Sequence, residues 1–153
     1  MIILSKLADY GVIVATQLAV GAEEVQQMTA SALAERTKLP RATVAKVLKA
    51  LAHAGIVTGA RGAAGGYRLA RPASVISIAE VVAAIDGAMG LTQCTTHMPA
   101  CERSAFCSTR PHWHRINNAV GTALAAVTLA EMVSPFGNFA PQPPESSRES
   151  ASP

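Results

Sequence analysis

A glycine-rich segment between two short apolar stretches is the feature that most limits how this chain can fold. Residues 56–58 and 67–69 favour strands, and residues 59–66 between them are mostly glycine and alanine. Apolar stretches on both sides of a Gly-rich turn predict a β-hairpin. The hairpin follows two expected helices, which a Leu39-Pro40 break separates. The order helix, break, helix and hairpin is typical of a winged helix-turn-helix.

The helices expected before the hairpin follow from apolar spacing and from capping residues. Apolar residues on one helical face predict a first helix over residues 4–20, and a second is expected over about 31–37, capped by Thr29 or Ser31. Pro40 suits the first turn of a third helix that ends near residue 54. A core-facing stripe recurs in it at Val44, Val47, Leu48 and Leu51. We therefore predict a mainly α fold with a small β-hairpin wing.

The charge of the chain is uneven. The net charge is +3, yet residues 35–71 hold eight lysines and arginines against one glutamate, and the remainder is net acidic. A basic segment in an otherwise acidic protein is typical of proteins that bind a polyanion. Because this segment coincides with the expected helix-turn-helix and wing, we predict that the ligand is double-stranded DNA. A solvated basic surface is the alternative.

Five side chains in the basic segment are candidates for DNA contacts. Arg41, Thr43 and Lys46 lie off the core stripe of the third helix and can reach base edges or phosphates. Lys49 is expected to contact the DNA backbone, and Arg61, in the glycine-rich turn, can enter a minor groove. A glycine-rich loop can also hold a nucleotide phosphate, but here no strand-loop-helix context or Gly-Lys-Ser/Thr ending surrounds it.

Two further helices are expected after the hairpin. Ser77 can cap a helix over about 78–86, and residues 91–112 have no regular pattern. A long helix is expected from Trp113 to about Val133, because apolar residues recur at heptad-like spacing at Trp113, Ile116, Val120, Ala123 and Val127. A second copy of the chain is the natural cover for this helix, which predicts a homodimer. The alternative is that the helix folds back onto its own domain.

These elements divide the chain into four parts. Residues 1–72 form the expected winged helix-turn-helix, residues 73–112 a linker helix and a cysteine-rich loop, and residues 113–133 a dimerisation helix. Residues 134–153 are rich in proline and serine, and we expect them to be disordered.

Composition argues against several classes of protein. No uncharged apolar run of about 18 residues is present, which argues against a transmembrane helix. Lys6 and Asp9 interrupt the apolar start, so we expect no signal peptide, and three cysteines do not suit a secreted disulfide framework. The chain is therefore expected to be cytoplasmic, with no membrane partner. No paired acid and base, nucleophile triad or nucleotide loop indicates an enzyme.

Three cysteines lie close together in the irregular segment. Cys94, Cys101 and Cys107 follow the spacing Cys-x6-Cys-x5-Cys, and thiolates favour iron–sulfur clusters or Zn²⁺. Three thiols leave either centre one ligand short. The fourth can come from nearby histidines or from a carboxylate of a partner copy, the candidates being His97, His112, His114 and Asp9. A disulfide switch between two of the thiols, or free or buried thiols without a metal, are the alternatives.

Several motifs together resemble one family of regulators. They are Leu4-Ser-Lys-Leu-Ala-Asp-Tyr10 at the start, Arg61-Gly…Gly65-Gly-Tyr-Arg-Leu-Ala-Arg-Pro72 in the wing, and the three cysteines before a helix that bears Trp113. Over about residues 2–133 the chain resembles the iron–sulfur-cluster-binding winged-helix transcriptional regulators of the IscR/NsrR type. Leu91-Thr-Gln-Cys94 and Trp113-His-Arg-Ile-Asn117 look most like the subgroup that regulates the SUF iron–sulfur assembly operon.

The resemblance implies a homodimeric repressor that carries a cluster and binds a palindromic operator. It implies that Cys94, Cys101 and Cys107 are the cluster ligands, and we expect a [2Fe-2S] rather than a [4Fe-4S] cluster. Arg110 stands where IscR-like members have a histidine ligand, whereas Asp9 matches the aspartate that NsrR-like members supply from the other subunit. The alternative function is a metal-free winged-helix repressor that responds to thiol oxidation or nitric oxide.

Overall fold

The fold was analysed in a computed structural model, which describes residues 4–20, 27–62, 65–96, 101–103 and 105–134. Six helices and one two-stranded antiparallel sheet occur in these residues: α1 (Lys6–Val20), α2 (Ala30–Thr37), α3 (Arg41–His53), β1 (Val57–Ala60), β2 (Gly66–Leu69), α4 (Ile78–Asp86), α5 (Arg110–Ala126) and α6 (Leu129–Val133). Short 3-10 turns cover Ala73–Val75 and Gln93–Thr95. The predicted mainly α fold with a β-hairpin is confirmed.

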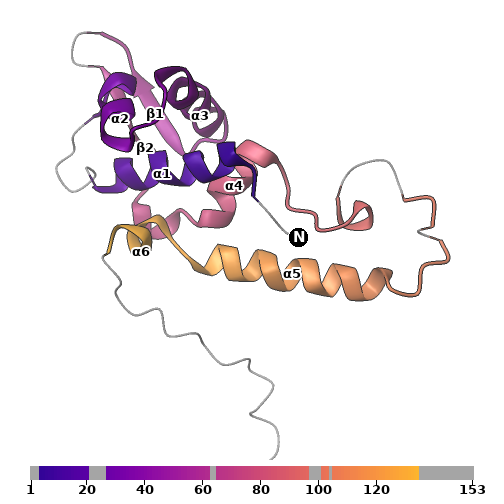
Figure 1. Cartoon of the computed structure of the whole chain (residues 1–153). Helices are drawn as coiled ribbons and strands as arrows, with labels where there is room; N and C mark the ends of the chain where they lie inside the picture. The colour runs from indigo at the N-terminus through magenta and orange to yellow at the C-terminus, as the bar shows by residue number, and fades with distance from the viewer. Residues whose placement is uncertain (1–3, 21–26, 63–64, 97–100, 104, 135–153) are drawn as a thin grey trace, which may run out of the picture.

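Helix α1 lies across the middle of the molecule. Figure 1 shows α2, α3 and the hairpin on one side of it and α4 and α6 on the other, and α1 contacts each of these helices. Its inner face is built from small residues, among them Ala8, Gly11 and Ala15, which are buried. A Cβ on Gly11 would overlap the end of the Ile85 side chain on α4. The absence of a side chain at residue 11 therefore lets the two helices pack closely.

Helices α2 and α3 form the helix-turn-helix. The Thr29 hydroxyl caps α2 by accepting a hydrogen bond from the Ala32 amide, at 3.1 Å, so Thr29 rather than Ser31 is the cap. Lys38 ends the helix in the left-handed conformation, with φ of 58°. Pro40 is the residue before α3 rather than part of its first turn. The ring of Pro40 fixes its φ angle, and α3 begins at the next residue.

The hairpin is paired from Val57 with Leu69 to Ala60 with Gly66. The residue before the cap of α2 extends this sheet: Met28 exchanges two backbone hydrogen bonds with Tyr67, at 2.9 and 2.8 Å. A Cβ on Gly66 would lie 3.0 Å from the Met28 backbone, so glycine suits this close approach. The wing is thereby attached to the start of the helix-turn-helix.

A salt bridge joins the base of the wing to α4. Arg71 Nη2 lies 2.7 Å from Glu80 Oε1, and Glu80 also accepts a hydrogen bond from the Ser77 amide in a reciprocal capping box. The Ser77 backbone hydrogen bond, followed by the Arg71 guanidinium, lowers the pKa of Glu80. The predicted Ser77 cap is confirmed, and its partner Glu80 also links α4 to Arg71, which follows the wing.

The prediction of one helix from Trp113 to Val133 is wrong. Helix α5 begins at Arg110, with Pro111 in its first turn, and ends at Ala126; Val127 is extended, and Thr128 caps the separate helix α6. The break is stabilised by backbone hydrogen bonds from Ile78 N to Val127 O and from Leu129 N to Ile76 O, each 2.9 Å. Backbone pairing and the Thr128 cap thus outweigh the heptad-like pattern, and Val127 is not part of that seam.

The two C-terminal helices differ in what they pack against. Leu129 of α6 is fully buried and α6 contacts α1, so this segment does fold back onto its own domain. Helix α5 has no buried residue among those described, and Trp113 and Ile116 are 38% and 45% exposed. The predicted disorder of residues 134–153 falls outside the described residues, except for Ser134.

Replacing Leu129 tests the docking of α6. Leu129→Ala should lower the free energy of unfolding by about 2–5 kcal/mol, because it removes a fully buried side chain and leaves a cavity. Met132→Ala on the same helix, where the side chain is 45% exposed, is the control and should change it by no more than about 0.5 kcal/mol. Urea denaturation followed by circular dichroism measures both, and equal midpoints would show that α6 is not docked.

Candidate nucleic-acid interface and cysteine loop

Helix α3 has two chemically distinct faces. Its inner face buries the four predicted core residues, each with no exposed surface: Val44, Val47, Leu48 and Leu51. Arg41, Lys46 and Lys49 are exposed, and Thr43 is half-buried at the edge between the two faces. The inner face thus holds the helix on the domain, while the outer face presents cations to a ligand.

The cations of this surface have no acidic partners in the described part of the chain. The one salt bridge there joins Arg71 and Glu80. Arg41, Lys46, Lys49 and Arg61 are therefore available to pair with phosphates, with release of the counterions that surround a nucleic acid. Helix α3 contacts β1, the first strand of the wing. Figure 1 shows both on the side of α1 that faces away from α5, so the basic residues of α3 and of the wing lie on the same side of the molecule.

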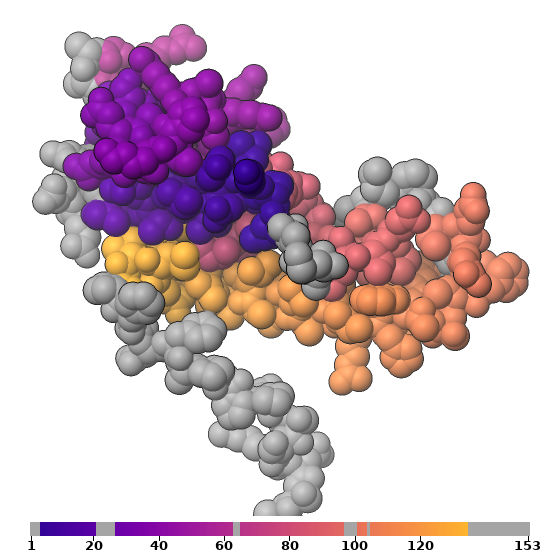
Figure 2. Space-filling model, viewed as in Figure 1, coloured from indigo at the N-terminus to yellow at the C-terminus, as the bar shows by residue number. Residues whose placement is uncertain are grey.

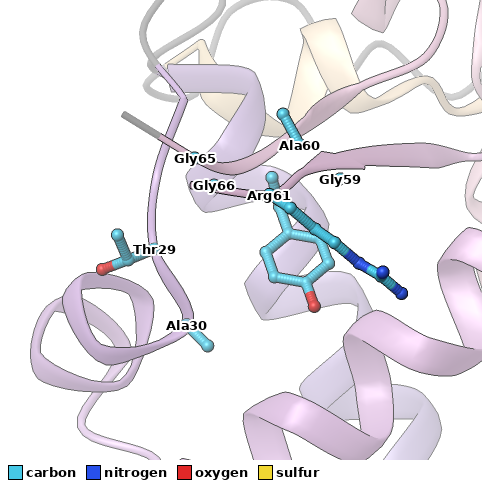
Figure 3. A pocket seen from close by; sticks show the side chains of 8 residues that line it. Thr29, Ala30, Gly59, Ala60, Arg61, Gly65 and Gly66 are labelled. Atoms are coloured by element: carbon cyan, nitrogen blue, oxygen red, sulfur yellow. The ribbon is translucent and has the colours of Figure 1, made fainter. Parts of the chain in front are cut away.

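A hollow of about 330 Å³ lies between the wing and the start of α2. Figure 3 shows its lining, which comes from Thr29 and Ala30 on one side and from Gly59, Ala60, Arg61, Gly65, Gly66 and Tyr67 on the other. Arg61 is exposed, as a wing residue that is to enter a minor groove must be. Neither Thr29 nor Tyr67 was predicted to line this hollow. The backbone bridge between Met28 and Tyr67 places Thr29 near Tyr67. A bridge of one residue pair has no periodic pattern in the sequence, so it could not be predicted.

The cysteine loop lies at the other end of the molecule. Cys94 is in the 3-10 turn Gln93–Thr95, and Cys101 and Cys107 follow in turns that lead into α5. All three thiols are free and half-exposed. Figure 1 and the space-filling view in Figure 2 show this segment around the end of α5 that projects beyond the winged helix. The described part of the loop therefore lies away from α3 of the same chain (Figure 1).

Two of the thiols have hydroxyl neighbours. Thr92 Oγ1 lies 3.1 Å from Cys94 Sγ, and Thr109 Oγ1 lies 3.2 Å from Cys107 Sγ. The hydrogen bond with the Thr109 hydroxyl lowers the pKa of Cys107, with help from the Thr109 and Arg110 amides and the charge of Arg103. These groups favour the thiolate, which is the form of cysteine that binds metals and reacts with oxidants.

The donor chemistry suits a cluster, but the described part of one chain does not assemble a site. Cysteine thiolates are the usual ligands of iron–sulfur clusters, and the three thiols supply all but one of the four. Within the described ranges, no three side chains of the metal-binding types lie close enough to hold one ion, and His97 is outside those ranges. Asp9 is exposed on α1, and His112 and His114 are exposed on α5. The assignment of Cys94, Cys101, Cys107 and Asp9 as ligands stays a prediction.

The geometry defines a class of protein. An α2-turn-α3 unit with an exposed basic face, beside a hairpin that leads to Arg61, is a winged helix-turn-helix of the DNA-binding type. The sequence profile of the Rrf2 family, described as "Iron-dependent Transcriptional regulator", matches residues 4–135. The chain belongs to the Rrf2 family of DNA-binding transcriptional regulators. As for a membrane location, the described residues contain no helix that is long and apolar enough to span a bilayer.

Relatives and solved structures agree with this assignment. The protein rrf2 of Nitratidesulfovibrio vulgaris is 30% identical over 130 residues, which are 85% of this chain and 86% of that protein. The structure of CymR, the global cysteine regulator of B. subtilis, is 25% identical with a TM-score of 0.68, and covers 87% of this chain and 97% of its own. The structure of T. potens IscR is 26% identical with a TM-score of 0.66, and covers 86% of each chain.

Removing one basic side chain from α3 tests the interface. Lys46→Ala should weaken binding to a mixed-sequence DNA duplex and reduce the slope of log affinity against log salt by about 1, the effect of one lost phosphate contact. Arg115→Ala is the control, because Arg115 is exposed on α5, on the other side of α1. Fluorescence anisotropy at several salt concentrations gives both slopes. An Arg115→Ala effect as large as that of Lys46→Ala would contradict the interface.

Proposed function

We propose that this protein is a homodimeric repressor of a SUF-type iron–sulfur assembly operon. We propose further that its cysteine loop, between α4 and α5, binds an iron–sulfur cluster. The observation that carries the proposal is the placing of three half-exposed thiols in one loop beside α5, on a chain with a free DNA-binding face. The proposed ligands are Cys94, Cys101 and Cys107 with Asp9 of the partner subunit, and the proposed cofactor is a [2Fe-2S] cluster. Such a regulator acts in the cytoplasm, where its operator lies.

Two comparisons support the choice of cofactor. The Rrf2 family is described as iron-dependent, and the T. potens protein of similar structure is an IscR. Because a helix cannot bring three sulfurs together, the segment between α4 and α5, whose described residues near the cysteines form short turns, is a suitable carrier.

The exposed face of α5 supports the proposed homodimer. Trp113 and Ile116 are large apolar side chains with 38% and 45% of their surface exposed, and no α5 residue is buried among those described. Apolar side chains grouped on one face mark an interaction surface. A two-fold dimer through α5 would present two copies of α3 to two half-sites, which is how a palindromic operator is read.

The second candidate function is a metal-free repressor that responds to thiol oxidation or nitric oxide. The similar structure of a global cysteine regulator favours it, and so do three free thiols that do not form a metal site within the described residues of one chain. In this case oxidation of the thiols, rather than loss of a cluster, would change the cysteine loop.

Metal analysis separates the two candidates. Protein purified without oxygen should contain iron and sulfide in near-equal amounts, and Cys101→Ser should lose both, because a missing thiolate leaves the cluster short of a ligand. Asp9→Ala should alter the absorbance spectrum, whereas the control Glu35→Ala, at an exposed residue of α2, should not. Protein that takes up neither iron nor sulfide on reconstitution would refute the cluster. DNA binding that then changes on peroxide treatment would establish the thiol-based repressor.

Sedimentation tests the proposed dimer. Ile116→Glu should raise the dissociation constant of the dimer by at least about tenfold, because an unpaired charge is costly to bury. Val75→Glu is the matched control, since Val75 is 56% exposed in the turn before α4. Sedimentation equilibrium of the wild type and both variants gives the constants. A wild type that is monomeric at micromolar concentration, or equal constants for the three proteins, would rule out the α5 interface.

A further inference from the structure

One amide side chain holds the beginning of the cysteine loop on α5. The Leu91 amide donates a hydrogen bond to Asn117 Oδ1, at 3.0 Å, and Asn117 Nδ2 donates to the Met89 carbonyl, at 3.4 Å. Both ends of one side chain are thus bonded to backbone groups two residues apart. A primary amide is suited to this role because it carries a donor and an acceptor side by side.

The backbone around these bonds is closely packed. A Cβ on Gly90 would overlap the Thr96 side chain, and a Cβ on Gly121, one turn after Asn117, would lie 3.5 Å from the Met89 methyl carbon. The turn Gln93–Thr95 also contacts α5. The segment therefore lies against the helix through contacts on both sides of the Asn117 bonds.

The same segment sets the place of Cys94. The Thr92 amide donates to Thr95 Oγ1 at 3.1 Å, and the Thr95 hydroxyl donates back to the Thr92 carbonyl at 2.9 Å. Within this closed turn the Thr92 hydroxyl lies 3.1 Å from Cys94 Sγ. Leu91, which Asn117 holds, is thus followed directly in the chain by Thr92, whose hydroxyl contacts the Cys94 thiol.

Cys107 depends on different contacts. Its thiol is next to the Thr109 hydroxyl, at 3.2 Å, in the turn that begins α5. Among the described residues, the hydrogen bonds of the Asn117 side chain go to Met89 and Leu91 alone. A change at Asn117 should therefore affect Cys94 and leave the surroundings of Cys107 as they are.

We infer that Asn117 is the positioning residue of the cysteine loop: it fixes the loop on α5 and so sets the place and accessibility of the Cys94 thiol. The placement follows from the contacts above. Its value for signalling rests on the proposed function, in which the loop is the sensor and α5 the dimer helix. The bond between them is then the route by which a change at Cys94 reaches α5.

A pair of asparagines on α5 provides a matched test. Asn117→Ala removes both hydrogen bonds, whereas Asn118→Ala makes the same truncation at the next residue, which is exposed and has no side-chain hydrogen bond in the described structure. Reduced, metal-free protein is treated with iodoacetamide, and mass spectrometry follows the alkylation rate at each cysteine. Circular dichroism verifies folding, and Asn117→Asp, which keeps only the acceptor, is used if Asn117→Ala does not fold.

Alkylation of Cys94 should be about fivefold faster in Asn117→Ala, because the 3.0 Å bond to Leu91 is lost and the 3.4 Å bond to Met89 is too long to add much. Loss of about one net hydrogen bond raises the population of the open loop by that factor. Cys107 should keep its rate, and Asn118→Ala should match the wild type at every cysteine. Equal acceleration at Cys94 and Cys107 would mean general destabilisation and would overturn the inference. An unchanged rate at Cys94 would overturn it as well.

A second measurement separates this inference from the proposed function. DNA binding by the wild type and Asn117→Ala is compared before and after peroxide treatment of the metal-free protein, and with the reconstituted protein. A wild type whose DNA binding ignores both treatments would refute the proposed sensor, while the alkylation result would still stand. If the wild type responds, the response of Asn117→Ala should be several-fold smaller, and an equal response would refute the route through Asn117.

Discussion

The close packing of α1 is the constraint on which the rest of the fold depends. This helix is in contact with α2, α3, α4 and α6, and its inner face is built from residues as small as Ala8 and Gly11. Small residues let the neighbouring helices approach until their larger side chains, such as Leu48 and Leu129, are fully buried. Because one helix supports both the DNA-reading unit and the C-terminal segment, the orientation of each is tied to the other.

The break between α5 and α6 divides the surface of the molecule into separate regions. The backbone bonds between Ile76–Ile78 and Val127–Leu129 attach one end of α5 to the winged helix, and the other end projects with the cysteine loop. The basic face of α3 consequently lies apart from α5 and from the described part of the cysteine loop, which contacts α5. The loop can influence DNA binding through α4, which precedes it and contacts α3, or along α5 and through a second copy of the chain. The positioning contacts on α5 bear on the second of these routes.

Much of the fold was predictable because its signals are local. Periodic apolar residues located the helices to within a few residues, and Ser77 followed capping rules. The break at Val127 was missed because the heptad-like pattern continues through it, and its cause is pairing with a segment some 50 residues earlier. For the site, exposure of Arg41, Lys46, Lys49 and Arg61 agrees with the prediction, since a residue off a core stripe must face solvent. No comparable local rule predicts how the three cysteines would be arranged around a cluster.

The sequence by itself determined the class of the protein. Its spacing of apolar residues, its breaks and its basic segment specify the helix-turn-helix and wing, because periodicity and turn chemistry act over a few residues. Tertiary structure alone decided where α5 ends, that Tyr67 and Thr29 line one hollow, and that Asn117 holds the backbone before Cys94. Those features depend on contacts between residues far apart in the chain. Tertiary packing, and not the neighbouring sequence, determines which side chains meet there.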